Sequence, residues 1–353
     1  PGPVPAAKQE PYLLQLTGSP PGVHCLHRAS LEMGNFFTAL AGNDHQVVTR
    51  DGRTPVVEKV PFIIRFQLAV LFATYLGNVL VMMDFLRNYI LRLTDNYGAQ
   101  FSHPDSKKLI PHFAEAYGVC SKEASLPMED YPTLNDFFHR ELKAGARPIH
   151  KAGDAEAAIQ PCDCRLSVFT TLTAAKSLWI KGTKFTGSTL TGGAWPEEEL
   201  EGASVVVCRL APTDYHRFHA PVAGRITRVT NLGRSLYTVK PVAINSRVDV
   251  LGENKRQVLE VESEAFGKVL YVVVGATHVG SIILTHKVGD KFDKGDELGY
   301  FAYGGSTVVA LFQPGALRLD DDLVLNSEEG LETLVQMGDS LGAASSDGSA
   351  NGR

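Results

Sequence analysis

The sequence lacks an excess of basic charge, which is typical of nucleic-acid-binding proteins, and a regular set of cysteines, which is typical of disulfide-stabilised proteins. Its formal net charge is -5 at pH 7, so we expect no strongly basic surface to neutralise phosphates and no nucleic-acid partner. Its five cysteines form an odd set without regular spacing, which argues against a disulfide scaffold and favours a reducing compartment. Cys162 and Cys164 are too close together for a zinc knuckle and have no partner pair, so we interpret both as small strand residues.

The N-terminal part has little periodic pattern and one long apolar run. The chain begins Pro1-Gly2-Pro3 without an initiator methionine, and we expect this end to be processed from a longer precursor. Proline and glycine interrupt residues 1–60 repeatedly, which indicates an irregular N-terminal extension. From Phe66 to Met83 the chain is apolar apart from Gln67, Thr74 and Asn78. This run fits three structures: a buried helix, a transmembrane span at the lower limit of length, or a hairpin or interfacial helix.

Short helical patterns follow the apolar run. Apolar residues recur at three- and four-residue spacing from Ile110 to Tyr117 and from Leu134 to Leu142, with Thr133 or Asn135 available as a cap. We therefore predict a helical, membrane-associating region over residues 61–148.

After about residue 150 the pattern becomes that of a β protein. Short runs of β-branched, leucine and aromatic residues alternate with Gly, Pro, Asn and Asp, and no long helical pattern separates them, so a βαβ architecture is not expected. The segment Val288–Gly299 is similar to the turn-and-strand unit of barrel-sandwich domains that carry biotin or lipoate, but it lacks the Met-Lys tip. We predict an α+β protein in which membrane-associating helices precede a β-rich catalytic domain with barrel-sandwich-like hairpins, over residues 149–342, and a disordered tail, residues 343–353. The predicted strands are 166–172, 204–210, 225–229, 258–261, 269–274, 281–285, 298–303 and 308–312.

Three sites within the β-rich part carry residues capable of chemistry. An aromatic run stops at Gly304-Gly305, Ser306 follows, and an apolar run resumes, which fits either a hairpin turn or a Gly-Ser peptide presented for reaction. His216 and His219 lie three positions apart between prolines, and paired imidazoles can divide acid and base roles near neutral pH. Asp163 lies in a short turn between two cysteines. Separate structural roles and a Ser-His-Asp arrangement both fit these residues.

Four stretches of the chain together resemble the phosphatidylserine decarboxylase family, in order from about Phe101 to Gly342. Members of this family are pyruvoyl enzymes whose precursor cuts itself before a serine, in a motif usually written Leu-Gly-Ser-Thr. Here the motif is Gly304-Gly305-Ser306-Thr307, which departs at its first position and keeps the Gly-Ser peptide bond. The stretches are Asn135–Leu142 with Arg147-Pro148-Ile149, Tyr215–Pro221, Val273–Ile282 and Gly299–Ser306.

The resemblance implies a mechanism for this chain. Ser306 Oγ would attack the Gly305 carbonyl, with His219 as base and Asp163 holding the His219 ring. Elimination from the resulting ester would give a β subunit ending at Gly305 and an α subunit beginning with a pyruvoyl group, and the interior strand Val308–Phe312 would hold the two subunits together. This covalent pyruvate would form a Schiff base with the amine of phosphatidylserine, and His216 would protonate the carbanion left by carbon dioxide, giving phosphatidylethanolamine. The resemblance calls for no metal.

The resemblance also implies that the protein acts on its substrate at a lipid bilayer. The apolar run favours a lipid substrate, and the mitochondrial inner membrane and endomembranes are both compatible with it; a homodimer is common in the family. Two interpretations from other classes are a non-catalytic β-rich membrane adaptor and a zinc-dependent hydrolase or phosphocarrier of the duplicated-hybrid β type. The zinc interpretation would use as ligands His216, His219, His278 and His286, of which we expect His278 to be non-essential in a decarboxylase.

Overall fold

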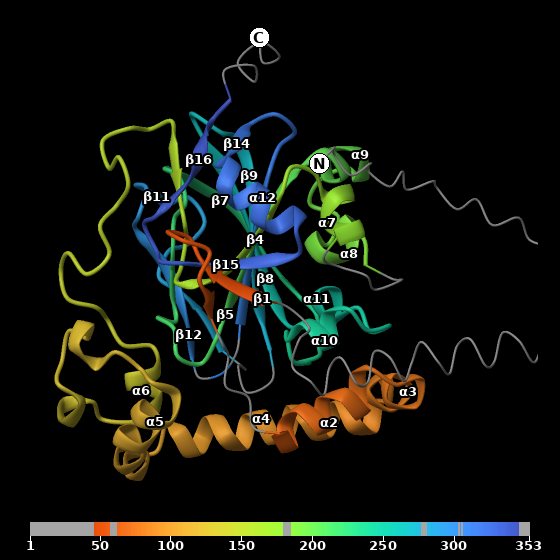
Figure 1. Ribbon diagram of the computed structural model, residues 1–353, viewed down its shortest axis with the longest axis vertical. Coiled ribbons are helices and arrows are strands. Elements are labelled where there is room, and N and C mark those ends of the chain that lie inside the picture. The colour runs from red at the N-terminus through yellow and green to blue at the C-terminus, as the bar shows by residue number, and fades with distance from the viewer. Residues whose placement is uncertain are drawn as a thin grey trace, which may run out of the picture.

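The computed structural model describes residues 46–56, 62–178, 185–276, 281–302, 304 and 306–345. A ten-stranded, mostly antiparallel sheet forms the centre of the molecule, and two three-stranded sheets accompany it (Figure 1). The strand order in the large sheet is β11-β7-β8-β9-β13-β5-β4-β15-β1-β2, and the small sheets are β10-β12-β6 and β14-β16-β3. A β-rich part built on a large sheet is therefore confirmed, whereas these sheet orders do not identify a barrel-sandwich.

The strands in chain order are β1 (Gln46–Thr49), β2 (Pro55–Val56), β3 (Ala157–Ile159), β4 (Cys164–Phe169), β5 (Ser204–Leu210), β6 (Arg217–His219), β7 (Gly224–Leu232), β8 (Arg256–Ser263), β9 (Gly267–Gly275), β10 (Ser281–Leu284), β11 (Lys291–Phe292), β12 (Glu297–Ala302), β13 (Ser306–Phe312), β14 (Leu317–Leu319), β15 (Leu331–Val335) and β16 (Ser340–Ala344). The α-helices are α2 (Phe62–Phe72), α3 (Tyr75–Met82), α4 (Asp84–Phe101), α5 (Ile110–Tyr117), α6 (Leu134–Phe138), α7 (Leu172–Leu178), α8 (Gly187–Thr191), α9 (Glu197–Gly202), α10 (Pro241–Ile244), α11 (Val250–Glu253) and α12 (Asp321–Glu328).

Strand β13 lies in the interior of the large sheet, between β5 and β9. Ser306 is opposite both Leu210 and Gly275, and the pairing continues without a break to Phe312. All seven residues of β13 are buried, which explains why its sequence is continuously apolar after Thr307. The expectation that Val308–Phe312 forms an interior strand is confirmed.

Two apolar cores cover the two faces of this sheet. Along β13, Val308 and Phe312 pack into one core together with residues of the small sheets, whereas Val309 and Leu311 pack into the other together with residues of α7, α8 and α9. The alternation follows from the two-residue period of a strand. The central strands are therefore covered on both faces, which makes them a rigid support for the loops at their ends.

The apolar run folds as two helices, α2 and α3, which meet at an angle of 86°. The polar residues of the run make this break: Thr74 caps α3 through Gly77 N, and Asn78 Nδ2 donates to the carbonyls of Phe72 and Thr74 at 2.8 and 2.7 Å. A Cβ at Gly77 would lie 2.0 Å from the Val70 carbonyl oxygen, so a larger residue would not fit there. Among the described residues no single helix meets the length and hydropathy needed to cross a bilayer, although this bent pair does so by composition.

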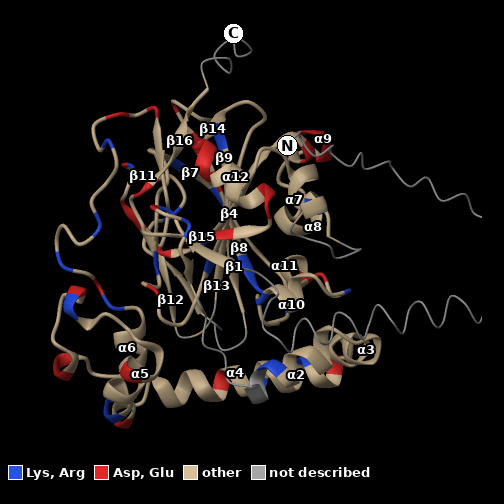
Figure 2. Ribbon diagram, viewed as in Figure 1, with Lys and Arg blue, Asp and Glu red and all other residues tan. Residues whose placement is uncertain are grey.

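Helices α2, α3 and α4 form a layer below one end of the large sheet, and this layer carries few charges (Figure 2). Asn78 Oδ1 accepts from Arg247 N at 2.8 Å, and Tyr237 OH donates to Val81 O at 3.1 Å. The same polar side chain that breaks the apolar run thus also attaches it to the β-rich part. The predicted helix at 110–117 is confirmed as α5. The helical pattern predicted from Leu134 to Leu142 is confirmed only in its first part, since α6 ends at Phe138, and Thr133 is its cap.

Strand pairing extends beyond the predicted boundaries of the β-rich domain at both ends. Residues Gln46–Thr49 pair in parallel with β15, and Val47 and Val48 are buried, so the expectation of an irregular extension is wrong for residues 46–56. Strand β16 continues to Ala344, two residues past the predicted end. The rest of the expected extension, apart from residues 46–56, and residues 346–353 of the expected tail lie outside the described residues.

Candidate active site

Ser306, the predicted nucleophile, is the first residue of β13. It is fully buried, and its Oγ has no hydrogen-bond partner among the described residues. Buried hydroxyls are normally hydrogen-bonded, so an unpartnered one requires an explanation such as a role in chemistry. Gly305 and Tyr303 lie outside the described residues, whereas Gly304 is buried and has a positive φ of 127°. Glycine tolerates that backbone conformation and most other residues do not.

His216 lies in the connection between β5 and β6 and is fully buried. Its Nδ1 lies 2.9 Å from the Asp214 carbonyl oxygen, and because a carbonyl can only accept, Nδ1 carries the proton. Nε2 therefore presents a lone pair, and it has no hydrogen-bond partner among the described residues. The Phe138 ring lies on the imidazole with 3.9 Å between ring centroids, which fixes the plane of the ring.

Burial keeps His216 neutral. Loss of hydration lowers the pKa of His216 to about 3, and the charge of Arg140 acts in the same direction. The Gly304 carbonyl favours the protonated imidazole, which puts this histidine next to the loop that carries the predicted cleavage site. His216 is thus a neutral acceptor directed at the chain segment between β12 and β13.

His219, the last residue of β6, is held at both ring nitrogens. Nδ1 donates to the Gly295 carbonyl at 2.8 Å, and Nε2 consequently accepts from the Tyr215 hydroxyl at 3.0 Å. Its backbone N–H donates to Pro161 O at 2.7 Å, which joins β6 to the turn that contains Asp163. Burial lowers the pKa of His219, while the Gly295 carbonyl and the charges of Glu297 and Asp163 oppose that shift.

Asp163 does not hold the His219 ring by a hydrogen bond, contrary to the expectation. Its carboxylate accepts from Arg147 Nε and Nη2, at 2.9 and 2.6 Å, and from the Met337 backbone N–H at 2.9 Å. A bidentate guanidinium is a stronger partner than a neutral imidazole, and Gly295 already takes the Nδ1 proton of His219. The link from Asp163 to His219 is therefore electrostatic, since the negative charge of Asp163 raises the pKa of His219 without a shared proton.

Two further residues, Tyr215 and Arg147, position the side chains of His219 and Asp163. Tyr215 donates to His219 and Arg147 fixes Asp163, yet neither was assigned a role. Both belong to the segments that resemble the family, since Tyr215 precedes His216 directly and Arg147 begins the Arg-Pro-Ile segment. The sequence feature that indicates them is a side chain able to donate hydrogen bonds, a phenol or a guanidinium, next to a predicted catalytic segment.

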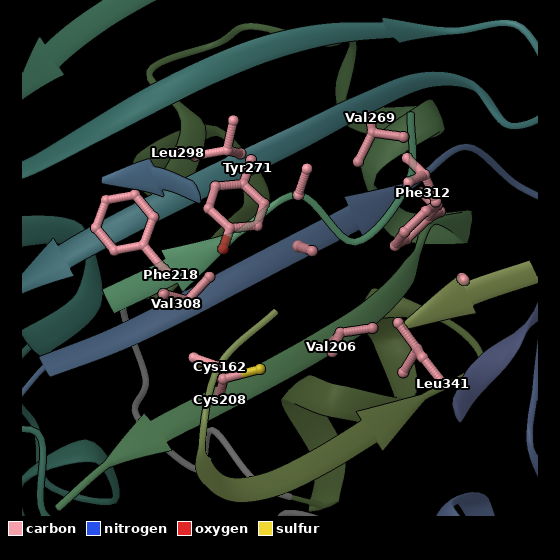
Figure 3. Packing of buried hydrophobic residues seen from close by; sticks show 14 of the residues in the cluster. Cys162, Val206, Cys208, Phe218, Val269, Tyr271, Leu298, Val308, Phe312 and Leu341 are labelled. Carbon is pink, nitrogen blue, oxygen red and sulfur yellow. The ribbon is translucent and has the colours of Figure 1, made fainter. Parts of the chain in front are cut away.

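The structure also brings together three thiols that the sequence did not connect. The sulfur atoms of Cys162, Cys164 and Cys208 all lie within 4.8 Å of one another, and all three residues are fully buried; Figure 3 shows Cys162 beside Cys208. Cys164 is a strand residue of β4, as expected, but Cys162 lies in the bend before it. Burial raises the pKa of Cys162 and Cys164, which favours neutral thiols packed in the core.

The arrangement supports acyl chemistry better than zinc chemistry. Across the part of the chain that the structure describes, the group of residues able to hold a metal consists of the three cysteines and includes no histidine. His216 and His219 each direct Nδ1 at a carbonyl, and His278 lies outside the described residues. By contrast, an unpartnered serine hydroxyl and an unpartnered imidazole nitrogen near one loop fit a pyruvoyl group derived from Ser306.

Comparison with known proteins identifies the family to which the chain belongs. The family model described as phosphatidylserine decarboxylase matches residues 134–343, which include α6, both histidines, Asp163 and Ser306. The chain is 40% identical over 237 residues to the phosphatidylserine decarboxylase proenzyme of Chlamydia caviae, covering 67% of this chain and 79% of that protein.

Longer relatives are similar over most of the chain. Phosphatidylserine decarboxylase proenzyme 2 of Komagataella phaffii is 38% identical over 309 residues, and that of Oryza sativa subsp. japonica is 39% identical over 326 residues. These matches cover 86% and 90% of this chain but only 30% and 51% of the two relatives, so the chain spans about a third and about half of their lengths. The match to the family model and the identity to the bacterial proenzyme show that the chain belongs to the phosphatidylserine decarboxylase family.

Proposed function

We propose that this chain is the precursor of a carboxy-lyase that makes its own pyruvoyl group from Ser306 and converts phosphatidylserine to phosphatidylethanolamine. The observation that carries the proposal is the buried, unpartnered Oγ of Ser306 at the start of an interior strand. The serine follows Gly304 and Gly305 within the region that the family model matches. The names of the relatives supply the substrate and the proenzyme character.

Self-cleavage starts at the Gly305–Ser306 peptide. Ser306 Oγ attacks the Gly305 carbonyl while His219 takes its proton at Nε2, and the chain passes from amide to ester as the nitrogen of Ser306 becomes a free amine. Loss of the Ser306 α-proton then expels the Gly305 carboxylate, which keeps the former Oγ. Water hydrolyses the remaining enamine, through its imine, to a ketone and releases ammonia. Asp163 contributes by favouring the charged form of His219 through its nearby negative charge.

The chain's residues then act on the substrate. A pyruvoyl group at position 306 supplies the electron sink for decarboxylation, because it can condense with the substrate amine. His216 lies next to Gly304 and delivers a proton to the carbon from which carbon dioxide departed. In the free protein His216 is neutral, and an anionic headgroup in the site would favour the protonated imidazole that this step requires.

We also propose that the α2–α4 layer docks on the lipid bilayer. Of the 17 exposed large hydrophobic residues among those described, ten lie between Phe66 and Tyr97. Leu76 and Phe85 are 68% and 81% exposed, which is unusual for apolar side chains of this size. The helices α2 and α3 are too sharply bent for a straight span, so an interfacial position fits them better. This surface would place the active site near its lipid substrate.

Denaturing electrophoresis tests the proposed function. The unmodified chain should separate into a large fragment and a small fragment, with the small one blocked to Edman sequencing, while Ser306→Ala should remain whole. Thr307→Val, a matched change of the adjacent buried hydroxyl, should still cleave. A single full-length band in an active preparation that requires a metal would contradict the proposal.

A further inference from the structure

Arg140 is a buried cation without a carboxylate partner among the described residues. It follows α6, is 5% exposed, and forms none of the ion pairs found in the described part of the chain. Its contacts are weak, because Nη1 and Nη2 approach the carbonyls of Phe137 and Thr213 at 3.5 Å and Nε has no partner. The guanidinium also lies over the Phe137 ring, 5.3 Å from its centroid.

Other buried or half-buried arginines of the described chain have their charge or their donors satisfied. Arg147, Arg165, Arg209 and Arg217 each pair with a carboxylate, from Asp163, Asp214, Glu332 and Glu297 respectively. Arg256 has no ion pair, but it donates to four carbonyls, those of Leu190, Gly252, Asn254 and Thr189. Arg140 has neither arrangement. A buried charge left without a partner is strongly destabilising, so its retention suggests that an anion completes the site.

Arg140 lies beside the proposed reaction centre. Phe138, two residues before Arg140, packs against the His216 imidazole with 3.9 Å between ring centroids. Arg140 also approaches the carbonyl of Thr213, which lies three residues before His216. Its positive charge also contributes to the lowered pKa of His216. Tyr131 lies close enough to interact electrostatically with Arg140, and its hydroxyl is buried without a hydrogen-bond partner among the described residues.

We infer that Arg140 binds the phosphodiester of the substrate headgroup, with the Tyr131 hydroxyl as a second donor. The inference rests on the proposed function, since it assigns a site for one part of that substrate. A planar guanidinium matches two phosphate oxygens, and the bound anion would supply the missing partner of the buried charge. Arg140 is thus a binding residue, and it takes no part in self-cleavage.

The serine carboxylate of the headgroup is a less suitable partner for Arg140. That group loses its negative charge as carbon dioxide departs, so a cation held against it would stabilise the substrate more than the transition state. The phosphodiester keeps its charge throughout the reaction. An arginine directed at the phosphodiester therefore anchors the headgroup without opposing the chemistry.

Kinetics with soluble headgroup analogues test the assignment. Arg140→Gln should self-cleave like the unmodified protein, should raise KM for dispersed short-chain phosphatidylserine by about tenfold or more with a smaller change in kcat, and should weaken inhibition by glycerophosphoethanolamine by a similar factor. Inhibition by L-serine, which has the carboxylate but no phosphate, should not change. Arg228→Gln, which removes an exposed positive charge on β7, is the matched control and should behave like the unmodified protein.

The outcomes separate this inference from the proposed function. Absence of cleavage in the unmodified protein contradicts the proposed function. A cleaved Arg140→Gln protein with unchanged inhibition by glycerophosphoethanolamine overturns the assignment of Arg140, as does weakened inhibition by L-serine alone. If Arg140→Gln fails to cleave, Arg140→Lys decides by the same inhibition constants, because it keeps the charge and loses the two-pronged geometry.

Discussion

At the scale of single residues, the hydrogen bonds of the His219 ring nitrogens determine which of them can act as a base. His219 can act as a base only at Nε2, because Nδ1 donates to Gly295. Tyr215 occupies that position as a donor, so its hydroxyl must turn away before Nε2 can accept a proton from Ser306. Tyr215 therefore stabilises the resting form of His219 rather than its basic action.

This gives a prediction for Tyr215. Tyr215→Phe removes the competing donor while keeping the ring, so we expect self-cleavage to persist at an undiminished rate, measured by the appearance of the small fragment over time. His219→Asn removes the base and should abolish cleavage. A Tyr215→Phe chain that stays whole but folds normally by circular dichroism would show instead that the hydroxyl relays the proton.

The buried His216 predicts how stability depends on pH. Its folded pKa of about 3 lies below the ordinary value of about 6.5, so as the pH falls below 6.5 the unfolded chain gains a proton that the folded chain does not. The free energy of unfolding should therefore fall between about pH 6.5 and 3, by up to about 1.4 kcal/mol per pH unit for this group.

Urea denaturation of the uncleaved Ser306→Ala chain at several pH values measures this slope. Adding His216→Gln should make the slope shallower, whereas His112→Gln, a change at an exposed position, should leave it as it was. Equal slopes with and without His216 would contradict the assignment of a neutral buried imidazole.

The predicted site residues come from sequence motifs, whereas their hydrogen-bond partners could not be predicted from the sequence. Ser306 begins β13, Asp163 directly precedes β4, and His216 and His219 lie just before and at the end of β6. The sequence could not show that Gly295 rather than Asp163 binds His219 Nδ1. The choice depends on a backbone carbonyl from a segment 76 residues away in the chain. A backbone carbonyl is present at every residue, so the sequence does not mark which one is the partner. The choice depends on the packing of segments that are far apart in the chain.

At the scale of elements, β13 links the chemistry to the stability of the fold. Because β13 pairs with strands on both sides, a break before Ser306 would leave seven residues held by β5 and β9. The two fragments should therefore remain one particle after cleavage, since the hydrogen bonds and both cores remain in place. The strand is at once the start of the proposed α subunit and its main attachment.

Truncation of the core residue Leu311 tests this attachment. Leu311 is fully buried in β13, so Leu311→Ala should lower the free energy of unfolding of the Ser306→Ala chain by about 2–5 kcal/mol. In the cleaving background, gel filtration should show fragment dissociation at lower urea concentration than in the unmodified protein. Leu325→Ala, at a 56% exposed position, should change neither measurement. Fragments that separate in buffer without denaturant would contradict the account of β13.

The α2–α4 layer leads to a prediction about membranes. Leu76→Glu with Phe85→Glu places two charges on the exposed apolar surface, and we expect partition onto phosphatidylserine-containing vesicles to fall by about tenfold or more. Vesicle co-sedimentation measures the effect, with retained self-cleavage as a check on folding. Leu109→Glu, which alters an exposed leucine outside the layer, is the control. Undiminished partition of the double variant would show that this layer is not the docking surface.

Elements with strong local patterns were predicted well, and those defined by distant partners were not. All eight predicted strands have counterparts, because runs such as Ser204–Leu210 are rich in β-branched residues. The other eight strands, β1, β2, β3, β6, β11, β14, β15 and β16, were missed. Strands β1 and β6 are examples, since each is only three or four residues long and exists through its pairing, with β15 and β12 respectively. The break between α2 and α3 was marked by Thr74, Gly77 and Asn78, but their capping contacts became clear only in three dimensions.

At the scale of the whole molecule, a sheet covered on both faces presents the loops at one end beside an apolar helical layer (Figure 1). The sequence supported the β-rich class and the order of helical and β-rich parts. It could not give the order of ten strands, because that order depends on pairs far apart in the chain, such as Gln46 with Leu331. Proposed cleavage, subunit cohesion and lipid access all depend on this arrangement.

The mass of the fragment that begins at residue 306 tests the central claim most directly. Intact-mass spectrometry of the denatured protein should show this fragment about 17 Da lighter than the same segment with an unmodified serine, since conversion to a pyruvoyl group releases ammonia. The complementary fragment should end at Gly305 with an ordinary carboxylate. A fragment with an unmodified Ser306, or a chain that remains whole while it decarboxylates phosphatidylserine, would contradict the account.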